Sequence, residues 1–198
     1  MTDIGVIGGA GYVGLVTSIA FAALGHKVMA MDLDKHRVAL LSRGSSAVYE
    51  DGLEPILAEL LRQDRITFTV DQNRTVQNSD ALFIAVGTPS LSDGAADMSA
   101  VIDVAQRLCG EIDKYTVIVV KSTVPVGSIS VISDVLSQKL TQGEDFDVVS
   151  NPEFLREGSG LIDFFSPARI IVGSASERAS KVLRDIYQPL IDEFGQKS

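Results

Sequence analysis

The sequence predicts an α/β fold in which a doubly wound, mainly parallel β-sheet carries helices on both faces. Short apolar runs alternate along the chain with longer segments of helical period, as a right-handed chain of β-α-β units requires. Hydrophobic residues make up 45% of the chain and aromatic residues only 6%, so aliphatic side chains dominate, as expected of strands buried on both faces. A glycine-rich turn between the first apolar run and the first helical segment indicates the Rossmann type of this fold.

The glycine-rich turn lies in a strand, loop, helix and strand unit over residues 4–32. Gly9, Gly11 and Gly14 have G-x-G-x-x-G spacing. In this motif the first glycine allows a tight turn, the second lets a pyrophosphate approach the backbone, and the third lets helix and strand pack closely. An amphipathic helix is expected up to Leu24, with its N-terminal N–H groups facing the phosphates.

Asp32 ends the second apolar run, where a carboxylate can accept hydrogen bonds from both hydroxyls of an adenosine ribose. These features predict a bound dinucleotide. Because Asp32 would repel a 2'-phosphate and the adjacent Leu33 and Asp34 offer no cation, the sequence favours NAD over NADP. Arg37, one turn into the next helical segment, either stacks on the adenine or is an exposed helix arginine.

The chain's first 24 residues also allow a membrane span or a signal peptide, since residues 4–24 carry no charge. Asp3 stands where a signal peptide needs positive charge, and four glycines suit a membrane helix poorly. The net charge of -9 argues against nucleic acid or an anionic membrane as partner. The single cysteine, Cys109, excludes an internal disulfide and fits a cytoplasmic protein. It lies on the apolar side of a predicted helix, so we expect it to be a core residue. No metal site is expected in the chain.

The remaining elements follow in order. Helical period marks 35–44, 53–61 and 101–109, Ser176 caps a last helix, and strands are expected at 66–70, 81–86, 116–120, 147–150 and 169–172. Pro125 is expected in the first turn of the helix after strand 116–120, which places Ser122 and Thr123 at the strand-to-helix corner, where one hydroxyl could cap that helix. No linker or repeat interrupts the chain, so residues 1–198 are predicted to form one domain.

For Glu153 and Arg156, the sequence allows either a role in ligand binding or a purely structural role. The carboxyl ends of parallel strands form the ligand-binding edge of an open α/β sheet, and both residues 87–89 and Glu153 follow such ends. Glu153 is either a general base in a partly enclosed position or a surface carboxylate that caps the next turn. Arg156 either contacts a ligand or forms an ion pair with Glu157 or Asp163.

Five motifs appear in a fixed order: GAGYVGLV at 9–16, VGTP at 86–89, DGAADMS at 93–99, KSTVPVG at 121–127, and VVSNPEFLREGSGLIDF at 148–164. In this order and spacing, the chain resembles the UDP-glucose 6-dehydrogenases of the UDP-glucose and GDP-mannose dehydrogenase group. The resemblance implies NAD-dependent oxidation of UDP-glucose to UDP-glucuronate by two successive hydride transfers at C6. GDP-mannose 6-dehydrogenase is the alternative within the group.

The resemblance also implies roles for single residues. Thr123 and Glu153 would be catalytic, since they match the residues that position a water and handle protons. Glu153, Phe154, Leu155 and Arg156 would bind the sugar nucleotide. The NAD site would comprise Gly9, Gly11, Tyr12, Val13, Gly14, Asp32, Arg37, Val86, Gly87, Thr88, Pro89, Ser122, Thr123 and Glu157.

The chain departs from the family pattern in two places. Asp51 stands where the family usually has proline, which is expected to change a loop. The family pattern continues with a long helix and a C-terminal domain that carries the nucleophilic cysteine, and these 198 residues contain neither. The chain alone is therefore expected to be inactive. The resemblance also implies that the full-length family member is a homodimer or a higher oligomer.

Two other functions remain open at this stage. A non-catalytic NAD-binding module would explain the same motifs without the missing cysteine. A dehydrogenase of 3-hydroxy acids would explain the glycine-rich turn, but it would leave the segment NPEFLREG at 151–158 unexplained.

Overall fold

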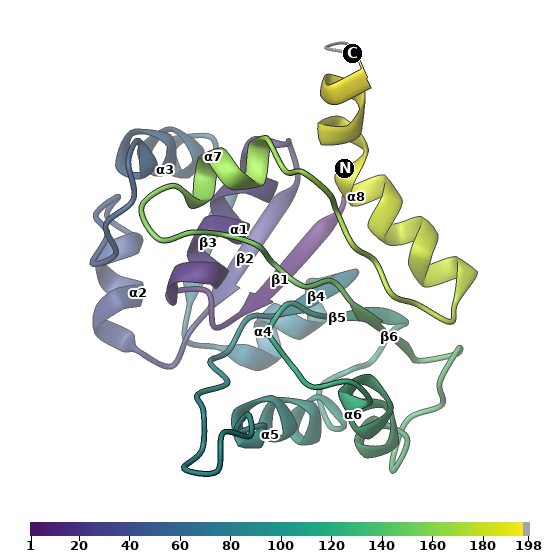
Figure 1. The fold of residues 1–198 in the computed structure, drawn as a ribbon. Coiled ribbons are helices and arrows are strands. Elements are labelled where there is room, and N and C mark those ends of the chain that lie inside the picture. The colour runs from purple at the N-terminus through teal and green to yellow at the C-terminus, as the bar shows by residue number, and fades with distance from the viewer. Residues whose placement is uncertain (196–198) are drawn as a thin grey trace.

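The computed structural model describes residues 1–195 and contains a six-stranded parallel sheet (Figure 1). The strands are β1 (Asp3–Ile7), β2 (Lys27–Met31), β3 (Ile66–Thr69), β4 (Ala81–Ile84), β5 (Thr116–Val120) and β6 (Phe146–Ser150). Their order is β3-β2-β1-β4-β5-β6, and every neighbouring pair is parallel. The predicted doubly wound Rossmann-type sheet is confirmed. Its order reverses between β1 and β4, and such a switch point opens a crevice at the carboxyl ends of the strands.

Helices cover both faces of the sheet (Figure 1). They are α1 (Tyr12–Ala23), α2 (Lys35–Leu41), α3 (Leu53–Arg62), α4 (Gln72–Gln77), α5 (Ser99–Leu108), α6 (Ser128–Leu136), α7 (Gly160–Phe165) and α8 (Glu177–Gly195). One hydrophobic cluster joins a face of the sheet to α1, α3, α7 and α8. A second cluster joins the other face to α5 and α6. The strands are therefore buried on both sides, as their aliphatic composition predicts.

Helix α1 differs from the amphipathic helix that the sequence predicts, because every residue from Gly14 to Ala22 is buried. The sheet covers one side of α1, and α7 and α8 cover another. Phe21 shows this arrangement, since its ring contacts Phe83 of β4, Phe164 of α7 and Tyr187 of α8. Complete burial explains the uncharged stretch. None of the helices in residues 1–195 is long and apolar enough to cross a membrane.

The strand expected at residues 169–172 is wrong. This segment is irregular, and one antiparallel bridge between Ser150 and Gly173 is its nearest approach to pairing with β6. Strand β6 ends at Ser150, and the side chain of Asn151 then donates to the backbone oxygen of Ile171 at 2.7 Å. A side-chain amide thus takes the acceptor that a strand ladder would use.

Two helix starts test the capping predictions. Pro125 does not lie in the first turn of α6, because that helix begins at Ser128 after Gly127, which adopts a left-handed conformation with φ 93°. Pro125 instead belongs to the preceding turn, and its oxygen accepts from Ser128 N at 3.2 Å. Ser176 caps α8 as predicted, since its Oγ accepts from Ala179 N at 3.2 Å.

Candidate functional site

The glycine-rich turn connects β1 to α1 and leaves little room for side chains. Gly8 has φ 84°, so the left-handed position of the turn falls on Gly8 and not on Gly9. A Cβ on Gly14 would lie 2.1 Å from Gly8 O, which requires glycine there for the close packing of helix and turn. A Cβ on Gly11 would meet only Gly8 O, at 3.4 Å. The backbone at Gly11 is thus open on its outer side, as an approaching pyrophosphate needs.

Asp32 holds the glycine-rich turn against the end of β2. Its Oδ2 accepts from Ala10 N at 2.9 Å, and its Oδ1 accepts from Asp34 N at 3.0 Å. The carboxylate is only half-buried, and each of its oxygens has a further lone pair for a ribose hydroxyl. Arg37 is a partly exposed helix arginine whose Nε lies 3.4 Å from Asp34 Oδ2, and it borders the same cavity as Asp32.

Three cavities follow one another along the carboxyl ends of the strands. The Asp32 cavity, of about 340 Å³, is lined by Gly11, Asp32, Arg37, Val86 and Gly87 together with Leu33, Gln72, Asp103 and Arg107. The Thr123 cavity, of about 280 Å³, is lined by Gly11, Tyr12, Val13, Val86, Gly87, Thr88, Lys121, Ser122, Thr123 and Glu153. The Arg156 cavity, of about 290 Å³, includes Lys121, Asn151, Glu153, Phe154, Leu155, Arg156, Asp163, Arg169 and Tyr187.

The three cavities bring together most of the residues that the sequence singles out. The Asp32 and Thr123 cavities share Gly11, Val86 and Gly87, so they lie on either side of the glycine-rich turn. Four predicted residues border none of the three: Gly9 and Gly14, which pack inside the turn, and Pro89 and Glu157, which are exposed.

Hydroxyl groups join the loops after β4 and β5. Ser122 Oγ donates to Val86 O at 2.6 Å, and Thr88 Oγ1 donates to Thr123 O at 2.8 Å. Ser122 therefore does not cap α6, whose N-terminus has no side-chain cap. Thr123 is exposed at the cavity wall. A hydroxyl in this position can donate to one ligand atom and accept from another.

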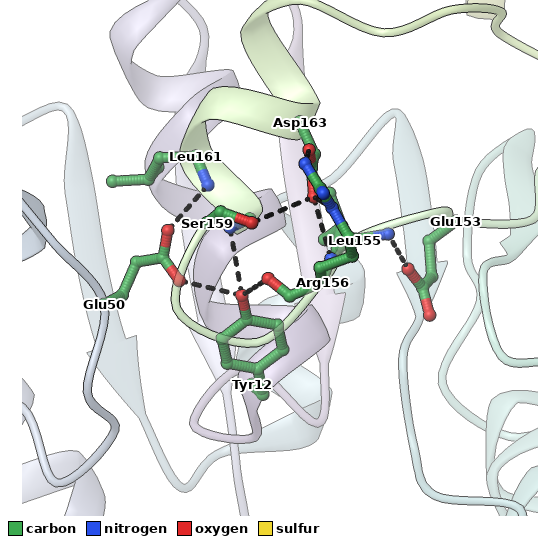
Figure 2. Close-up of polar contacts among 9 residues, drawn as sticks. Tyr12, Glu50, Glu153, Leu155, Arg156, Ser159, Leu161 and Asp163 are labelled. Carbon is green, nitrogen blue, oxygen red and sulfur yellow. Dashed lines mark hydrogen bonds and ion pairs between the residues drawn. The ribbon is translucent and has the colours of Figure 1, made fainter.

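Glu153 caps a turn and Arg156 forms an ion pair, which are the structural roles that the sequence leaves open beside ligand binding. Glu153 is half-buried, and its Oε2 accepts from Leu155 N, so it does cap the turn that follows. Arg156 pairs with Asp163 through two contacts, of 2.6 and 3.0 Å (Figure 2). Hydrogen bonding from Arg156 lowers the pKa of Asp163 to about 2. Both residues nevertheless line the Arg156 cavity.

Tyr12 and Glu50 connect the start of α1 to the segment that carries Glu153 and Arg156. The hydroxyl of Tyr12 is shared between Glu50 Oε2, at 2.8 Å, and the backbone oxygen of Arg156, and it accepts from Gly160 N at 3.1 Å (Figure 2). Glu50 Oε1 accepts from Leu161 N at 2.9 Å. Burial, followed by the hydrogen bond to Glu50, raises the pKa of Tyr12 to about 12. Sequence reasoning missed Glu50, because its partners Tyr12 and Leu161 lie 38 and 111 residues away along the chain.

Lys121 is the second residue that sequence reasoning missed. Its side chain is 3% exposed, and its Nζ lies 3.3 Å from Asn151 Oδ1. Burial lowers the pKa of Lys121 to about 8, and the charge of Glu153 opposes this shift. A lysine directly after the fully apolar strand Thr116–Val120 was the available signal, since lysine is rarely buried without a partner.

Cys109 is partly buried and packs against the second hydrophobic cluster, so the predicted core position is found at the edge of the core. Its Sγ lies 3.4 Å from both Ala105 O and Val135 O, between α5 and α6, and it borders none of the three cavities. Within residues 1–195 no group of three or more His, Cys, Asp or Glu side chains is placed to hold a metal ion.

Comparisons with known proteins bear on the family and the fold of the chain. The family model described as "UDP-glucose/GDP-mannose dehydrogenase family, NAD binding domain" matches residues 2–191. The UDP-glucose 6-dehydrogenase of Pseudomonas aeruginosa is 43% identical over 186 residues, which cover 92% of this chain and 41% of that protein.

Two solved structures have the same architecture. A UDP-glucose dehydrogenase from the archaeon Pyrobaculum islandicum matches with a TM-score of 0.89 and 41% identity, covering 95% of this chain and 44% of that one. A ternary complex of GDP-mannose dehydrogenase from Pseudomonas aeruginosa matches with a TM-score of 0.90 and 32% identity, covering 93% of this chain and 44% of that one. The chain thus spans less than half the length of these relatives.

An open glycine-rich turn, a carboxylate at the end of β2 and a row of cavities along the switch point together suit a dinucleotide that lies across the sheet edge. The family model extends over nearly the whole chain. The chain therefore belongs to the UDP-glucose/GDP-mannose dehydrogenase family and has the fold of its NAD-binding domain.

Proposed function

We propose that the chain is the NAD-binding domain of a UDP-glucose 6-dehydrogenase and supplies part of its active site. The reaction oxidises the C6 hydroxyl of UDP-glucose to the carboxylate of UDP-glucuronate. Four electrons leave as two hydrides to two NAD molecules in succession, and a water supplies the second carboxylate oxygen. Identity of 43% to a UDP-glucose 6-dehydrogenase, against 32% to a GDP-mannose dehydrogenase, supports UDP-glucose as the substrate.

The cavities suggest how NAD would lie. The ribose of the adenosine would bind the carboxylate of Asp32 in the Asp32 cavity, with Arg37 beside it. The pyrophosphate would lie on the open backbone at Gly11 and the N-terminus of α1, whose N–H groups and dipole favour an anion. The nicotinamide would then reach the Thr123 cavity, which adjoins the other side of the turn. When bound there, NAD supplies the hydride acceptor.

The observation that carries the proposal is the position of Glu153, which lines both the Thr123 cavity and the Arg156 cavity. A sugar nucleotide held along Phe154 and Arg156 would therefore present its C6 to the nicotinamide beside this carboxylate. Glu153 would accept a proton from the C6 hydroxyl or from the attacking water, and the Thr123 hydroxyl would orient that water. Cys109 packs between α5 and α6 and borders none of the three cavities, so it would not supply the nucleophile.

The native gene product tests this proposal when it is incubated with NAD and either UDP-glucose or GDP-mannose. We expect two NADH for each sugar acid formed from UDP-glucose, and no sugar acid from GDP-mannose. Turnover of GDP-mannose alone would assign the other activity of the family. NAD binding without turnover of either sugar nucleotide would assign a non-catalytic binding module.

The 198-residue chain provides a second, separate test. We expect it to bind NAD, since the glycine-rich turn, the N-terminus of α1 and Asp32 are all present. We expect no UDP-glucuronate, because its single cysteine borders none of the three cavities. Steady release of NADH and sugar acid from this chain would show that these 198 residues contain a nucleophile that the proposal does not assign.

A further inference from the structure

The buried ammonium of Lys121 has no role in the mechanism above. The lysine follows β5 directly, and its backbone N donates to Ile84 O at 2.9 Å, so the end of the sheet fixes its position. Its Nζ contacts Asn151 Oδ1 at 3.3 Å. In the described part of the chain, no carboxylate lies within ion-pair distance of this ammonium.

Asn151 is itself held in one orientation. Its Nδ2 donates to Ile171 O at 2.7 Å, so its Oδ1 must face the other way. That oxygen accepts from the hydroxyl of the buried Tyr187 at 2.7 Å as well as from Lys121. An ammonium has three hydrogens, and this arrangement uses one of them. Lys121 is thus held by its neighbours without being neutralised by them.

Lys121 lies where its positive charge can act on bound ligands. The Thr123 cavity and the Arg156 cavity share two lining residues, Lys121 and Glu153. They carry opposite charges and stand where the proposed nicotinamide and sugar positions meet. Any charge that appears or disappears on the nicotinamide ring would be felt by both, in opposite directions.

We propose that Lys121 biases the nicotinamide end of the site toward the reduced cofactor. This inference rests on the proposed function, which places the nicotinamide in the Thr123 cavity. The oxidised ring carries a positive charge that the ring loses when it accepts a hydride, while the rest of the cofactor keeps its charge. A buried cation therefore weakens NAD⁺ binding relative to NADH, and Glu153 acts in the opposite sense. Tighter binding of NADH makes the bound cofactor a stronger oxidant of the sugar alcohol.

Burial lowers the pKa of Lys121 to about 8, so its ammonium is mostly charged at neutral pH and loses that charge at moderately alkaline pH. This behaviour supports the inference. Glu153, in the loop after β6, lines both cavities with Lys121. Tyr12 of α1 lines the Thr123 cavity with it, and Tyr187 of α8, Arg156, Arg169 and Asp163 line the Arg156 cavity with it. Burial raises the pKa of Tyr12 to about 12 and also raises that of Tyr187, while the pKa of Asp163 is about 2. Between about pH 6.5 and 9.5 the two tyrosines therefore stay uncharged and Asp163 stays ionised, whereas Lys121 loses its charge.

The quantity to measure is the ratio of the dissociation constants of NAD⁺ and NADH, obtained by calorimetric titration of the 198-residue chain. Both cofactors share the adenosine half, so effects on that half cancel in the ratio. We expect Lys121→Met to lower the ratio by about threefold to tenfold, the scale for one charge at intermediate effective dielectric. Glu153→Gln should raise it. The matched control is Lys139→Met, which removes an exposed lysine after α6 and should leave the ratio unchanged.

A pH series on the unmodified chain repeats the test without a substitution. Its ratio should fall between about pH 6.5 and 9.5 toward the value of Lys121→Met, while the ratio of that variant should stay constant. If the variant fails to fold, as judged by circular dichroism, this series alone decides the question. Equal ratios at both pH values would overturn the inference and leave the NAD site intact. A chain that binds neither cofactor would overturn the NAD site and this inference together.

Discussion

The contact between Tyr12 and Glu50 allows a quantitative prediction about stability. The change Tyr12→Phe removes one oxygen and leaves the ring in place. That oxygen bonds to Glu50 Oε2 and Gly160 N (Figure 2). Glu50 is 7% exposed, so water cannot fully replace the lost partner. Hydrogen bonds to charged groups contribute about 1.5 to 3 kcal/mol, and we expect the free energy of unfolding to fall by this amount.

Urea denaturation followed by circular dichroism measures the loss. For a chain of this size, the same change should lower the melting temperature by about 3 to 12 °C. The matched control is Tyr49→Phe, because Tyr49 is the adjacent tyrosine and is 82% exposed. We expect that variant to unfold like the unmodified chain.

A double-mutant cycle with Glu50→Gln separates this contact from general damage. If the hydroxyl and the carboxylate act on each other, the two substitutions together should cost less than the sum of their separate costs, by about 1 kcal/mol or more. Additive losses would refute the reasoning, as would a Tyr12→Phe variant that is as stable as Tyr49→Phe.

Three further predictions concern the cofactor, the proposed catalytic residue and pH. Asp32→Ala should narrow the preference for NAD over NADP in titrations of both cofactors, and tighter binding of NADP by the unmodified chain would contradict the role of Asp32. Glu153→Gln should lower turnover of the native gene product about a hundredfold or more, with little change in melting temperature; a large loss of stability with normal turnover would make Glu153 structural. Burial lowers the pKa of His26, whose ring contacts Ile186 O at 2.9 Å. The unfolded chain therefore binds this proton more readily, so stability should fall as pH drops below about 6.5, and His26→Gln should flatten that slope in urea titrations at several pH values.

The parts of the fold that sequence predicts best are those set by neighbouring residues. The unit from β1 to β2 is correct because its glycine spacing and its apolar runs are local signals, and Asp32 follows from the same unit. The amphipathic pattern expected for α1 fails for the opposite reason. Helices α3, α7 and α8 also cover α1, and all of them come later in the chain, α7 and α8 by more than 100 residues. The sequence of α1 alone does not show that these helices will pack against it.

The same distinction separates the site residues found from those missed. Thr123 and Glu153 lie three residues beyond the carboxyl ends of β5 and β6, so their place at the sheet edge follows from strand direction. Glu50 and Lys121 act through partners brought close only by the complete fold, namely Leu161 and Asn151. The strand expected at residues 169–172 is wrong. The side chain of Asn151 donates to the backbone oxygen of Ile171 in this segment, and the pattern of apolar residues does not predict such a contact.

The burial of α1 on all sides also limits how the site can respond to its ligand. In the proposed site, helix α1 would present its N-terminus to the phosphates, and every residue from Gly14 to Ala22 is buried. The helix can neither turn about its axis nor slide without disturbing the sheet, α7 and α8 together. In the proposed site it would therefore be a fixed support for the cofactor, and we expect any adjustment on binding to occur in the loops after β4, β5 and β6, which line the three cavities.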